Sequence, residues 1–115
     1  MSTAIGKRGE DQACEFLEGK GYIIRGRNYR AGRNEIDIIA EKDAVIVFVE
    51  VKAKSNLRFG NPEESVDAKK AARVVEAADQ YIFEEGWEGN IRFDVVAIST
   101  QKGQVSILHF EDAFY

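Results

Sequence analysis

Two charged side chains, Glu50 and Lys52, stand one residue apart near the end of the apolar run VFVEVKAKS at residues 47–55. Alternation along a β-strand places both on one face, together with Phe48. A carboxylate beside an ammonium at the end of a buried strand is one way to build a site that holds a cation and handles phosphate. The plainer interpretation is a solvated strand end, whose ion pair contributes at most about 1 kcal/mol.

A further carboxylate, Asp37, lies in the preceding segment EIDIIAE, and the two segments are predicted to form a β-hairpin. If a two-residue loop pairs Glu41 with Ala44, Asp37 and Glu50 are diagonal neighbours on one face. A four-residue loop places them directly opposite each other. Both arrangements bring the two Cβ atoms within roughly 5–8 Å. A three-residue loop would put the carboxylates on opposite faces.

Two carboxylates at that separation repel each other unless a cation lies between them. Mg²⁺ or Mn²⁺, which prefer oxygen ligands, would meet this requirement. We therefore predict a metal site formed by Asp37 and Glu50, with the backbone carbonyl of Val51 as a further ligand. On the same face, Lys52 would orient a water molecule or stabilise charge that develops on a phosphate.

Residues 2–18 have the apolar spacing of a helix. Glu10 shares its helical face with three apolar residues, which lie three, four and seven positions further on: Ala13, Cys14 and Leu17. Glu10 is therefore predicted to point inward, where a glutamate is rare without a partner. Cys14, the only cysteine, is predicted to fill the core, and a chain with one cysteine suits a reducing compartment.

Basic side chains gather in two parts of the sequence. A second helix is predicted over residues 63–85, and within it Lys70 and Arg73 interrupt the apolar face. From there they either snorkel to solvent or reach a bound phosphate. Other basic residues are arranged so that they could follow a nucleic-acid backbone, although plain solvation is the simpler interpretation of each: Arg25, Arg27, Arg30, Arg33, Lys54 and Arg58.

Charge is distributed unevenly along the 115 residues, whose formal net charge is −4. Residues 1–33 hold seven Lys/Arg against four Asp/Glu, a balance of +3, whereas residues 34–115 have a balance of −7. Such an acidic protein is not expected to coat nucleic acid unspecifically. No apolar run is long enough to span a bilayer and no signal peptide is apparent, so we expect a cytoplasmic protein without membrane association.

Composition and pattern exclude or weaken other sites. His109 is the only histidine, which excludes a His-rich zinc site. No P-loop or dinucleotide fingerprint occurs in the sequence. Asp94 is a candidate for a third metal ligand, but alternation places it on the same strand face as Arg92, which favours a simple ion pair.

The remaining patterns predict the fold class. Both hairpin strands are apolar on both faces, which indicates the centre of a covered sheet. With the two helices, five strand patterns give the order α-β-β-β-α-β-β, an α/β fold in one domain over residues 1–115. The predicted strands cover residues 22–29, 35–41, 44–52, 91–99 and 105–110.

Four ordered motifs resemble the YraN family of small bacterial proteins: GKRGEDQACEFLEGKGYIIRGRNYR, NEIDIIA, VFVEVKAKSNLRFGNPEESVDAKKAARV and IRFDVVAI. That family is assigned to the PD-(D/E)XK nuclease-like superfamily, and its layout is similar to archaeal Holliday-junction resolvases. The resemblance implies an αβββαβ restriction-endonuclease-like core, in which a central mixed sheet is flanked by helices. Asn34 stands where the family usually has glycine, which affects the entry to a strand rather than a ligand.

The resemblance also implies roles for individual residues. Asp37 matches the metal-binding aspartate of the superfamily, and Glu50 and Lys52 match its (D/E)-x-K element. Glu10 matches the first-helix glutamate that completes the metal site in the resolvase-like branch. Lys70 matches a basic residue of the second helix that is typical of the family.

Taken together, these patterns lead us to expect a nuclease, dependent on Mg²⁺ or Mn²⁺, that hydrolyses phosphodiester bonds in DNA, with branched or damaged structures as candidate substrates. Lys70 and Arg73 would contact the nucleic-acid backbone. A branched substrate requires paired active sites, which would favour a homodimer. Two alternatives stay open: a catalytically inactive nucleic-acid-binding module of the same fold, and a partner-binding domain with an incidental acidic pocket.

Overall fold

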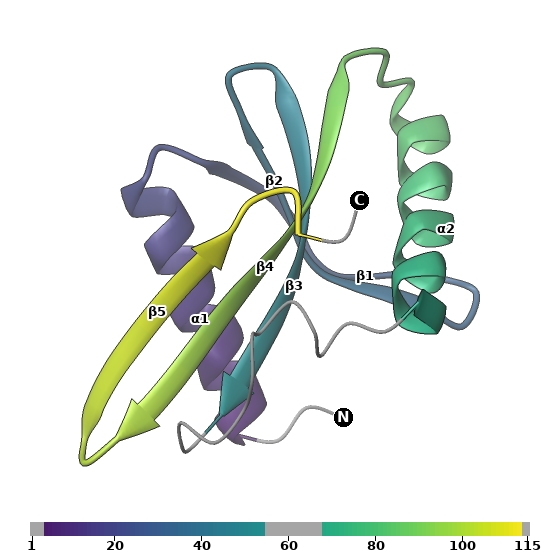
Figure 1. Ribbon diagram of the computed structural model, residues 1–115. Coiled ribbons are helices and arrows are strands. Elements are labelled where there is room, and N and C mark those ends of the chain that lie inside the picture. The colour runs from purple at the N-terminus through teal and green to yellow at the C-terminus, as the bar shows by residue number, and fades with distance from the viewer. Residues whose placement is uncertain (1–3, 55–67, 114–115) are drawn as a thin grey trace.

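Two helices and five strands make up the computed structural model (Figure 1), which describes residues 4–54 and 68–113 and, among these, the side chains of residues 9–53 and 68–113. In chain order the elements are α1 (Ala4–Gly19), β1 (Ile23–Ala31), β2 (Asn34–Lys42), β3 (Val45–Lys54), α2 (Ala68–Glu85), β4 (Asn90–Gln101) and β5 (Gln104–Phe110). The predicted order of elements and the α/β class are confirmed. The part of the second helix that was expected before residue 68 lies outside the described residues.

The strands form one mixed sheet in the order β1-β2-β3-β4-β5. Sequential neighbours are antiparallel, except that β3 and β4 are parallel. A parallel pair needs a crossover connection, and α2 lies in the segment that connects β3 to β4. The centre of β3 is fully buried from Ile46 to Val49, as expected for a strand that is covered on both faces. Neither helix in the described ranges is long and apolar enough to cross a membrane.

The two helices cover opposite faces of the sheet (Figure 1), because successive side chains of each strand point to opposite sides. On one face, α1 packs against alternate residues of β2 and β3, and this layer contains Ala13, Cys14, Leu17, Ile38, Ala40, Val47 and Val49. On the other face, α2 packs against the intervening residues, and this layer contains Val74, Ala77, Ala78, Tyr81, Ile39, Ile46, Phe48 and Phe93. The predicted core position of Cys14 is confirmed.

The turn between β2 and β3 sets the register of the predicted hairpin. Its two residues, Asp43 and Ala44, have φ of 53° and 63°, and Lys42 pairs with Val45. Positive φ at both positions is typical of a type I′ turn, whose twist matches that of the flanking strands. The assumed pairing of Glu41 with Ala44 is therefore wrong, since Glu41 pairs with Ile46.

The sheet divides beyond the pair Ile38–Val49, which is the last pair of the β2–β3 ladder. From there β2 continues beside β1 to Asn34, whereas β3 continues beside β4 to Lys54. Figure 1 shows the two halves diverging, with the β1–β2 hairpin passing toward α2 and β3 remaining with β4 and β5. We refer to the point of separation, at Asp37 on β2 and Glu50 on β3, as the fork.

Candidate metal centre

Asp37 lies on β2 where the fork begins. Continuing the register by one residue beyond Ile38–Val49 places it opposite Glu50. This facing was expected only for a four-residue loop, whereas the turn has two residues, because the hairpin pairs Lys42 with Val45. The Asp37 carboxylate accepts a hydrogen bond at Oδ2 from the backbone N–H of Val51, with an N–O distance of 2.8 Å. A side chain thus supplies the acceptor at a point where the β2–β3 backbone ladder has ended.

Glu50 lies across the fork on β3, and its side chain is 5% exposed. Its position alternates with Val49, so it points toward the α2 face together with Ile46 and Phe48. Lys70, in the first turns of α2, places its Nζ atom 2.7 Å from Glu50 Oε1. Lys70 lies on the inward side of α2, as predicted, although 40% of its side chain is exposed, and its ammonium pairs with Glu50.

The electrostatics of the fork are dominated by burial and by the proximity of the carboxylates. Burial, followed by the charge of Glu50, raises the pKa of Asp37 to about 7, against the lowering effect of the Val51 amide. Burial alone would lower the pKa of Lys70, but its hydrogen bond and charge interaction with Glu50 outweigh that effect and raise it. At Asp37, therefore, burial and the charge of Glu50 outweigh the contacts that favour the ionised form.

Lys52 and Val51 follow Glu50 directly on β3. Lys52 is half-buried and lies two residues beyond Glu50, so it occupies the same face of the strand, as predicted. The contact made by Val51 at the fork is through its amide N–H to Asp37. Coordination of a metal by the Val51 carbonyl remains a prediction.

Glu10 approaches from α1 and is largely buried, with 12% of its side chain exposed. It accepts a hydrogen bond from Asn28 Nδ2 at 3.1 Å and lies 3.7 Å from Arg27 NH2. Asn28 has φ of 51°, a left-handed conformation that asparagine tolerates better than most residues. The inward direction of Glu10 is confirmed, whereas its partners on β1 were not identified from the sequence.

The donor set at the fork can be compared with the needs of a metal ion. Among the described residues, no group of three or more His, Cys, Asp or Glu side chains could hold a metal. Mg²⁺, however, is commonly bound through one or two carboxylates plus water and substrate phosphates. The partly buried Asp37 and the buried Glu50, which face each other, are two oxygen donors that fit that mode of binding. Participation of Glu10 remains a prediction.

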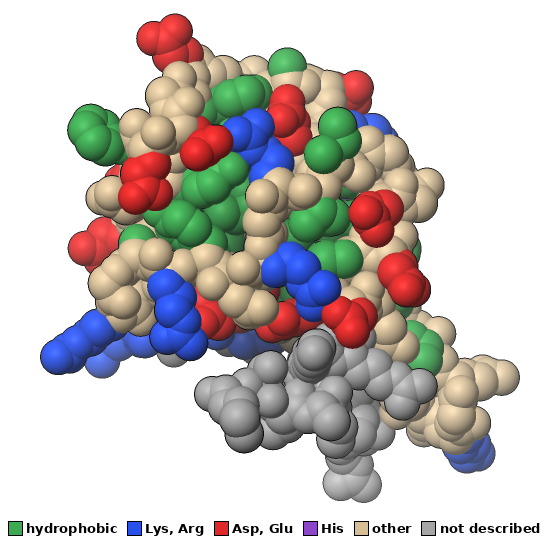
Figure 2. Space-filling model, turned by 180° about the vertical axis from the view of Figure 1, so that it is seen from behind, with side chains coloured by type: hydrophobic (Ala, Val, Ile, Leu, Met, Phe, Trp, Pro, Cys, Tyr) green, Lys and Arg blue, Asp and Glu red, His purple; other side chains and the backbone are tan. Residues whose placement is uncertain are grey.

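Several basic residues that were predicted to follow a nucleic-acid backbone have acidic partners. Arg27 pairs with Asp11 at 2.7 Å, and Arg30, whose side chain is 71% exposed, pairs with Glu35 at 2.9 Å. Arg33 is exposed in the turn between β1 and β2. Figure 2 shows that basic and acidic side chains are interspersed over much of the face it views, rather than forming one continuous basic stripe. Nucleic-acid contact by these residues stays a prediction.

Arg73 on α2 corrects one sequence-based expectation. It is exposed, and its Nε donates to the carbonyl of Lys69 at 3.3 Å. The prediction that Arg73 interrupts the apolar face is wrong, because the helix turns this side chain outward between the buried positions 71 and 74. The side chain of Lys54 and all of Arg58 lie outside the described residues, so their predicted roles cannot be placed on the fold.

Arg25 has a structural role that the sequence did not reveal. Its guanidinium donates to Tyr81 Oη at 2.8 Å, Glu41 Oε1 at 2.7 Å and Glu85 Oε1 at 2.9 Å. It thereby connects β1 to β2 and to the end of α2. These contacts commit Arg25 to the scaffold rather than to a nucleic-acid surface.

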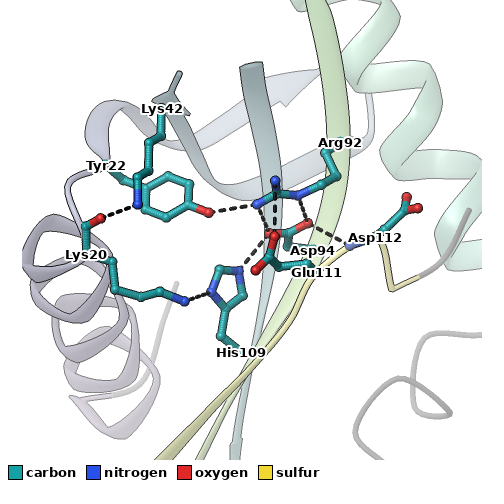
Figure 3. Close-up of polar contacts among 8 residues, drawn as sticks. All are labelled: Lys20, Tyr22, Lys42, Arg92, Asp94, His109, Glu111 and Asp112. Atoms are coloured by element: carbon teal, nitrogen blue, oxygen red, sulfur yellow. Dashed lines mark hydrogen bonds and ion pairs between the residues drawn. The ribbon is translucent and has the colours of Figure 1, made fainter. Parts of the chain in front are cut away.

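A separate polar cluster surrounds Asp94, which is fully buried on the α1 face of β4 (Figure 3). Arg92 donates to both of its carboxylate oxygens at 2.8 Å, and His109 Nε2 lies 2.7 Å from Oδ2. Lys20 Nζ is 2.7 Å from His109 Nδ1. Because an ammonium can only donate, Nδ1 must accept and Nε2–H must donate to Asp94. The predicted Arg92–Asp94 ion pair is confirmed.

The surroundings of Asp94 also exclude it from the fork. Burial alone would raise the pKa of Asp94, but the hydrogen bonds from Arg92, His109 and the Asp112 amide outweigh it and lower the pKa. In the β3–β4 ladder Asp94 pairs with Val49, whose side chain belongs to the α1 layer, whereas Glu50 points to the α2 face. Its candidacy as a third metal ligand at the fork is therefore wrong.

Comparison with known proteins identifies the relatives of this chain. The model of the uncharacterised protein family UPF0102 matches residues 9–98. The chain belongs to UPF0102. This result confirms the resemblance to YraN-like proteins, which are members of that family. A UPF0102 protein of Persephonella marina is 42% identical over 115 residues, which cover 99% of this chain and 96% of the relative.

Other UPF0102 relatives align over nearly their whole length as well. A protein of Cytophaga hutchinsonii is 45% identical over 103 residues, covering 90% of this chain and 91% of the relative. A protein of Phocaeicola vulgatus is 41% identical over 111 residues, covering 96% and 92% respectively. The fork, together with Glu10 and Lys70, lies inside the region that the family model matches.

Proposed function

We propose that this UPF0102 protein is a metal-dependent nuclease that hydrolyses phosphodiester bonds in DNA, with branched or damaged DNA as candidate substrates. The observation that carries the proposal is the position of Asp37 and Glu50 at the fork. Two strands separate there and leave two carboxylates facing each other, with Lys52 following on the same face. A binding domain has no need of two facing carboxylates at the edge of its core.

The roles of the residues follow from their positions. Asp37 and Glu50 supply oxygen ligands for the ion. A bound Mg²⁺ or Mn²⁺ would activate a water molecule and neutralise charge on the phosphate. Lys52 orients the attacking water or stabilises the negative charge that develops as that water adds to phosphorus and the bond to the leaving oxygen breaks.

Lys70 has two functions in this proposal. In the metal-free protein its ammonium neutralises part of the charge of Glu50, at 2.7 Å. A divalent ion held by Glu50 would weaken the attraction between Lys70 and that carboxylate. Its half-exposed side chain then contacts the phosphate backbone of the substrate, next to the exposed Arg73.

Cleavage of labelled DNA tests the proposal. Linear, single-stranded, flapped and four-way DNA would be incubated with the protein and Mg²⁺ or Mn²⁺, using wild type, Asp37→Asn and Asp79→Asn. Asp79 is an exposed acid on α2 and serves as the matched control. We expect metal-dependent cleavage by wild type and Asp79→Asn, and a loss of at least 100-fold in Asp37→Asn, since a ligand has been removed. Equal cleavage by all three proteins would contradict the assignment.

A non-catalytic nucleic-acid-binding module is the second candidate, and one observation favours it. Glu10, the potential third carboxylate, is held by Asn28 and lies beside Arg27, so it is already neutralised without a metal. In that case wild type and Asp37→Asn would bind DNA equally and neither would cut. Fluorescence anisotropy on the same DNA substrates, run beside the cleavage assay, separates the two candidates.

A further inference from the structure

The two edges of the sheet differ in how they are protected against pairing with another chain. Edge strands expose unpaired backbone groups, and proteins usually guard them with charges, proline or bulges. The edge strand β1 contains three arginines, Arg25, Arg27 and Arg30. The register with β2 also shifts between Ile24 and Gly26, and Asn28 is left-handed. The β1 edge is therefore well protected.

The β5 edge has none of these devices. Its sequence QVSILHF contains no Lys, Arg, Asp, Glu or Pro, and it pairs with β4 without a shift from Gln104 to Phe110. Two of its apolar side chains are strongly exposed, Val105 at 46% and Leu108 at 57%. In the described part of the sheet no strand lies beyond β5. Figure 1 shows the β4–β5 hairpin as the outer part of the sheet, with β5 on its outside.

The hairpin geometry shows which backbone groups this edge offers. Lys102 and Gly103 have φ of 53° and 77°, and Gln101 pairs with Gln104, so the turn is a two-residue type I′ turn. In such a hairpin the residues that flank the turn form a hydrogen-bonded pair. Gln104 and every second residue after it therefore bond to β4. The N–H and C=O groups of Val105, Ile107 and His109 point outward instead.

We propose that β5 is a dimerisation edge, which pairs in antiparallel orientation with β5 of a second copy of this chain. A two-fold axis at Ile107 places it opposite its own counterpart and Val105 opposite His109 of the other copy. These three hydrogen-bonded pairs form about six hydrogen bonds. No like charges meet across the axis, because the strand carries none. A second copy thus fits this strand without electrostatic cost.

The arrangement has a consequence for the fork, which rests on the proposed nuclease function. The two-fold axis of antiparallel strands in a continuous sheet is perpendicular to that sheet, so the α2 faces of both copies lie on the same side. Five strand spacings, about 24 Å, separate the two β3 strands across the sheet. Both forks then lie on the same side of the combined sheet, an arrangement that suits a nucleic acid that is cut in two strands.

The oligomeric state of the full chain tests this proposal without metal or DNA, so its failure is distinguishable from failure of the nuclease assignment. Analytical ultracentrifugation over about 1 µM to 1 mM should show a concentration-dependent dimer, since a single strand pair is at the small end of interfaces. A monomer over the whole range would overturn the proposal.

Substitutions to proline locate the interface. Val105→Pro removes an outward N–H that β4 does not use, so it should keep the fold and shift dimerisation at least tenfold toward monomer. Ile23→Pro is the matched control, because Ile23 is 67% exposed and opens the other edge strand; it should leave the dimer unchanged. Circular dichroism checks that both variants are folded. A dimer that persists in folded Val105→Pro would contradict dimerisation through the β5 edge.

Amide hydrogen exchange gives a second readout that needs no variant. At high concentration, protection should increase at Val105, Ile107 and His109, whose N–H groups point outward. Protection at Ser106 and Leu108, whose N–H groups bond to β4, should not depend on concentration. The same concentration dependence of amide exchange at every residue of β5 would contradict the predicted pairing.

Discussion

Two aspartates on opposite faces of one sheet, Asp94 fully buried and Asp37 partly buried, have opposite electrostatics. Asp94, on the α1 face, receives hydrogen bonds from Arg92 and His109 and from the Asp112 amide, and its pKa is lowered. Asp37, at the fork, receives a hydrogen bond from the Val51 amide and faces Glu50, and its pKa is raised to about 7. Burial acts on both in the same direction, so the difference lies in their partners.

The comparison distinguishes a carboxylate that stabilises the fold from one that is available for chemistry. A charge whose partners are all supplied by the chain has no further need of a ligand. A buried carboxylate that stands beside another carboxylate gains from any cation that enters, and such perturbed groups cluster at functional sites. The predictions below test this distinction, beginning with the largest expected effect.

Removal of the Asp94 carboxylate should have the largest effect on stability. Asp94→Ala leaves the guanidinium of Arg92 without its two short hydrogen bonds, and breaking a buried ion pair costs about 3–5 kcal/mol. Urea unfolding monitored by circular dichroism measures the loss. Glu111→Gln is the matched control, since this carboxylate lies 3.3 Å from Arg92 but is 57% exposed; it should cost less than about 0.5 kcal/mol. Similar losses of unfolding free energy in the two variants would show that Asp94 stabilises the fold no more than an exposed carboxylate does.

Asp37→Asn should have the opposite effect at neutral pH. As pH rises from about 4 to 7, the unfolded chain releases the Asp37 proton before the folded protein does, so the free energy of unfolding falls by roughly 2–4 kcal/mol. Asparagine can still accept the Val51 N–H but carries no charge. The variant should therefore be more stable than wild type at pH 7.5 and equal to it near pH 4.

A pH series of thermal unfolding, in buffers that contain a chelator, measures this difference. Asp79→Asn, at an exposed position of α2, should follow wild type throughout. At Asp94 the sign is reversed: its lowered pKa stabilises the fold above about pH 4, and that contribution is lost as the pH falls further. If Asp37→Asn were less stable than wild type at pH 7.5, the carboxylate would be a structural group like Asp94.

Metal binding should depend on Lys70, because its ammonium and a divalent ion compete for Glu50. Lys70→Met should bind Mn²⁺ about tenfold more tightly than wild type, a difference of about 1.4 kcal/mol. Lys69→Met removes the same charge at the neighbouring exposed position and should leave the affinity unchanged. Electron paramagnetic resonance of free Mn²⁺ measures both affinities. Weaker binding in Lys70→Met would show that Lys70 supports the ion rather than competing with it.

The smallest expected effect concerns the turn that sets the register of the two carboxylates. Ala44 has φ of 63°, which glycine adopts without strain. Ala44→Gly should therefore stabilise the fold by about 0.5–1 kcal/mol and leave the pH dependence due to Asp37 unchanged. Ala72→Gly, at an exposed position within α2, should destabilise by a similar amount. Differential scanning calorimetry measures both; a changed pH profile in Ala44→Gly would indicate a shifted register.

The sequence was sufficient for features that depend on local periodicity. The order of elements, the core position of Cys14 and the common face of Glu50 and Lys52 follow from alternation and helical spacing. The approach of Asp37 to Glu50 was also predicted, because both belong to one hairpin. Its register stayed open, since the turn residues Asp-Ala do not have the glycine typical of a type I′ turn.

Contacts between distant elements were not accessible in this way. The bond from Asn28 to Glu10 depends on how α1 is placed against β1, and the His109–Asp94 contact depends on the order of strands in the sheet. Arg73 was placed wrongly because helical spacing alone does not fix how far the buried stripe extends around α2. An arginine two residues before an aspartate in one strand, Arg92 and Asp94, was the available signal for the Asp94 cluster.

The hydrogen bond from the Val51 amide has a consequence for the geometry of coordination. It occupies Oδ2 of Asp37, so within the described part of the chain Oδ1 is the oxygen that the backbone leaves for other partners. Asp37 would be one of the residues that hold a cation at the fork, and the hydrogen bond from the neighbouring strand orients its carboxylate. The backbone of β3 thus orients one ligand of the proposed ion before that ion arrives.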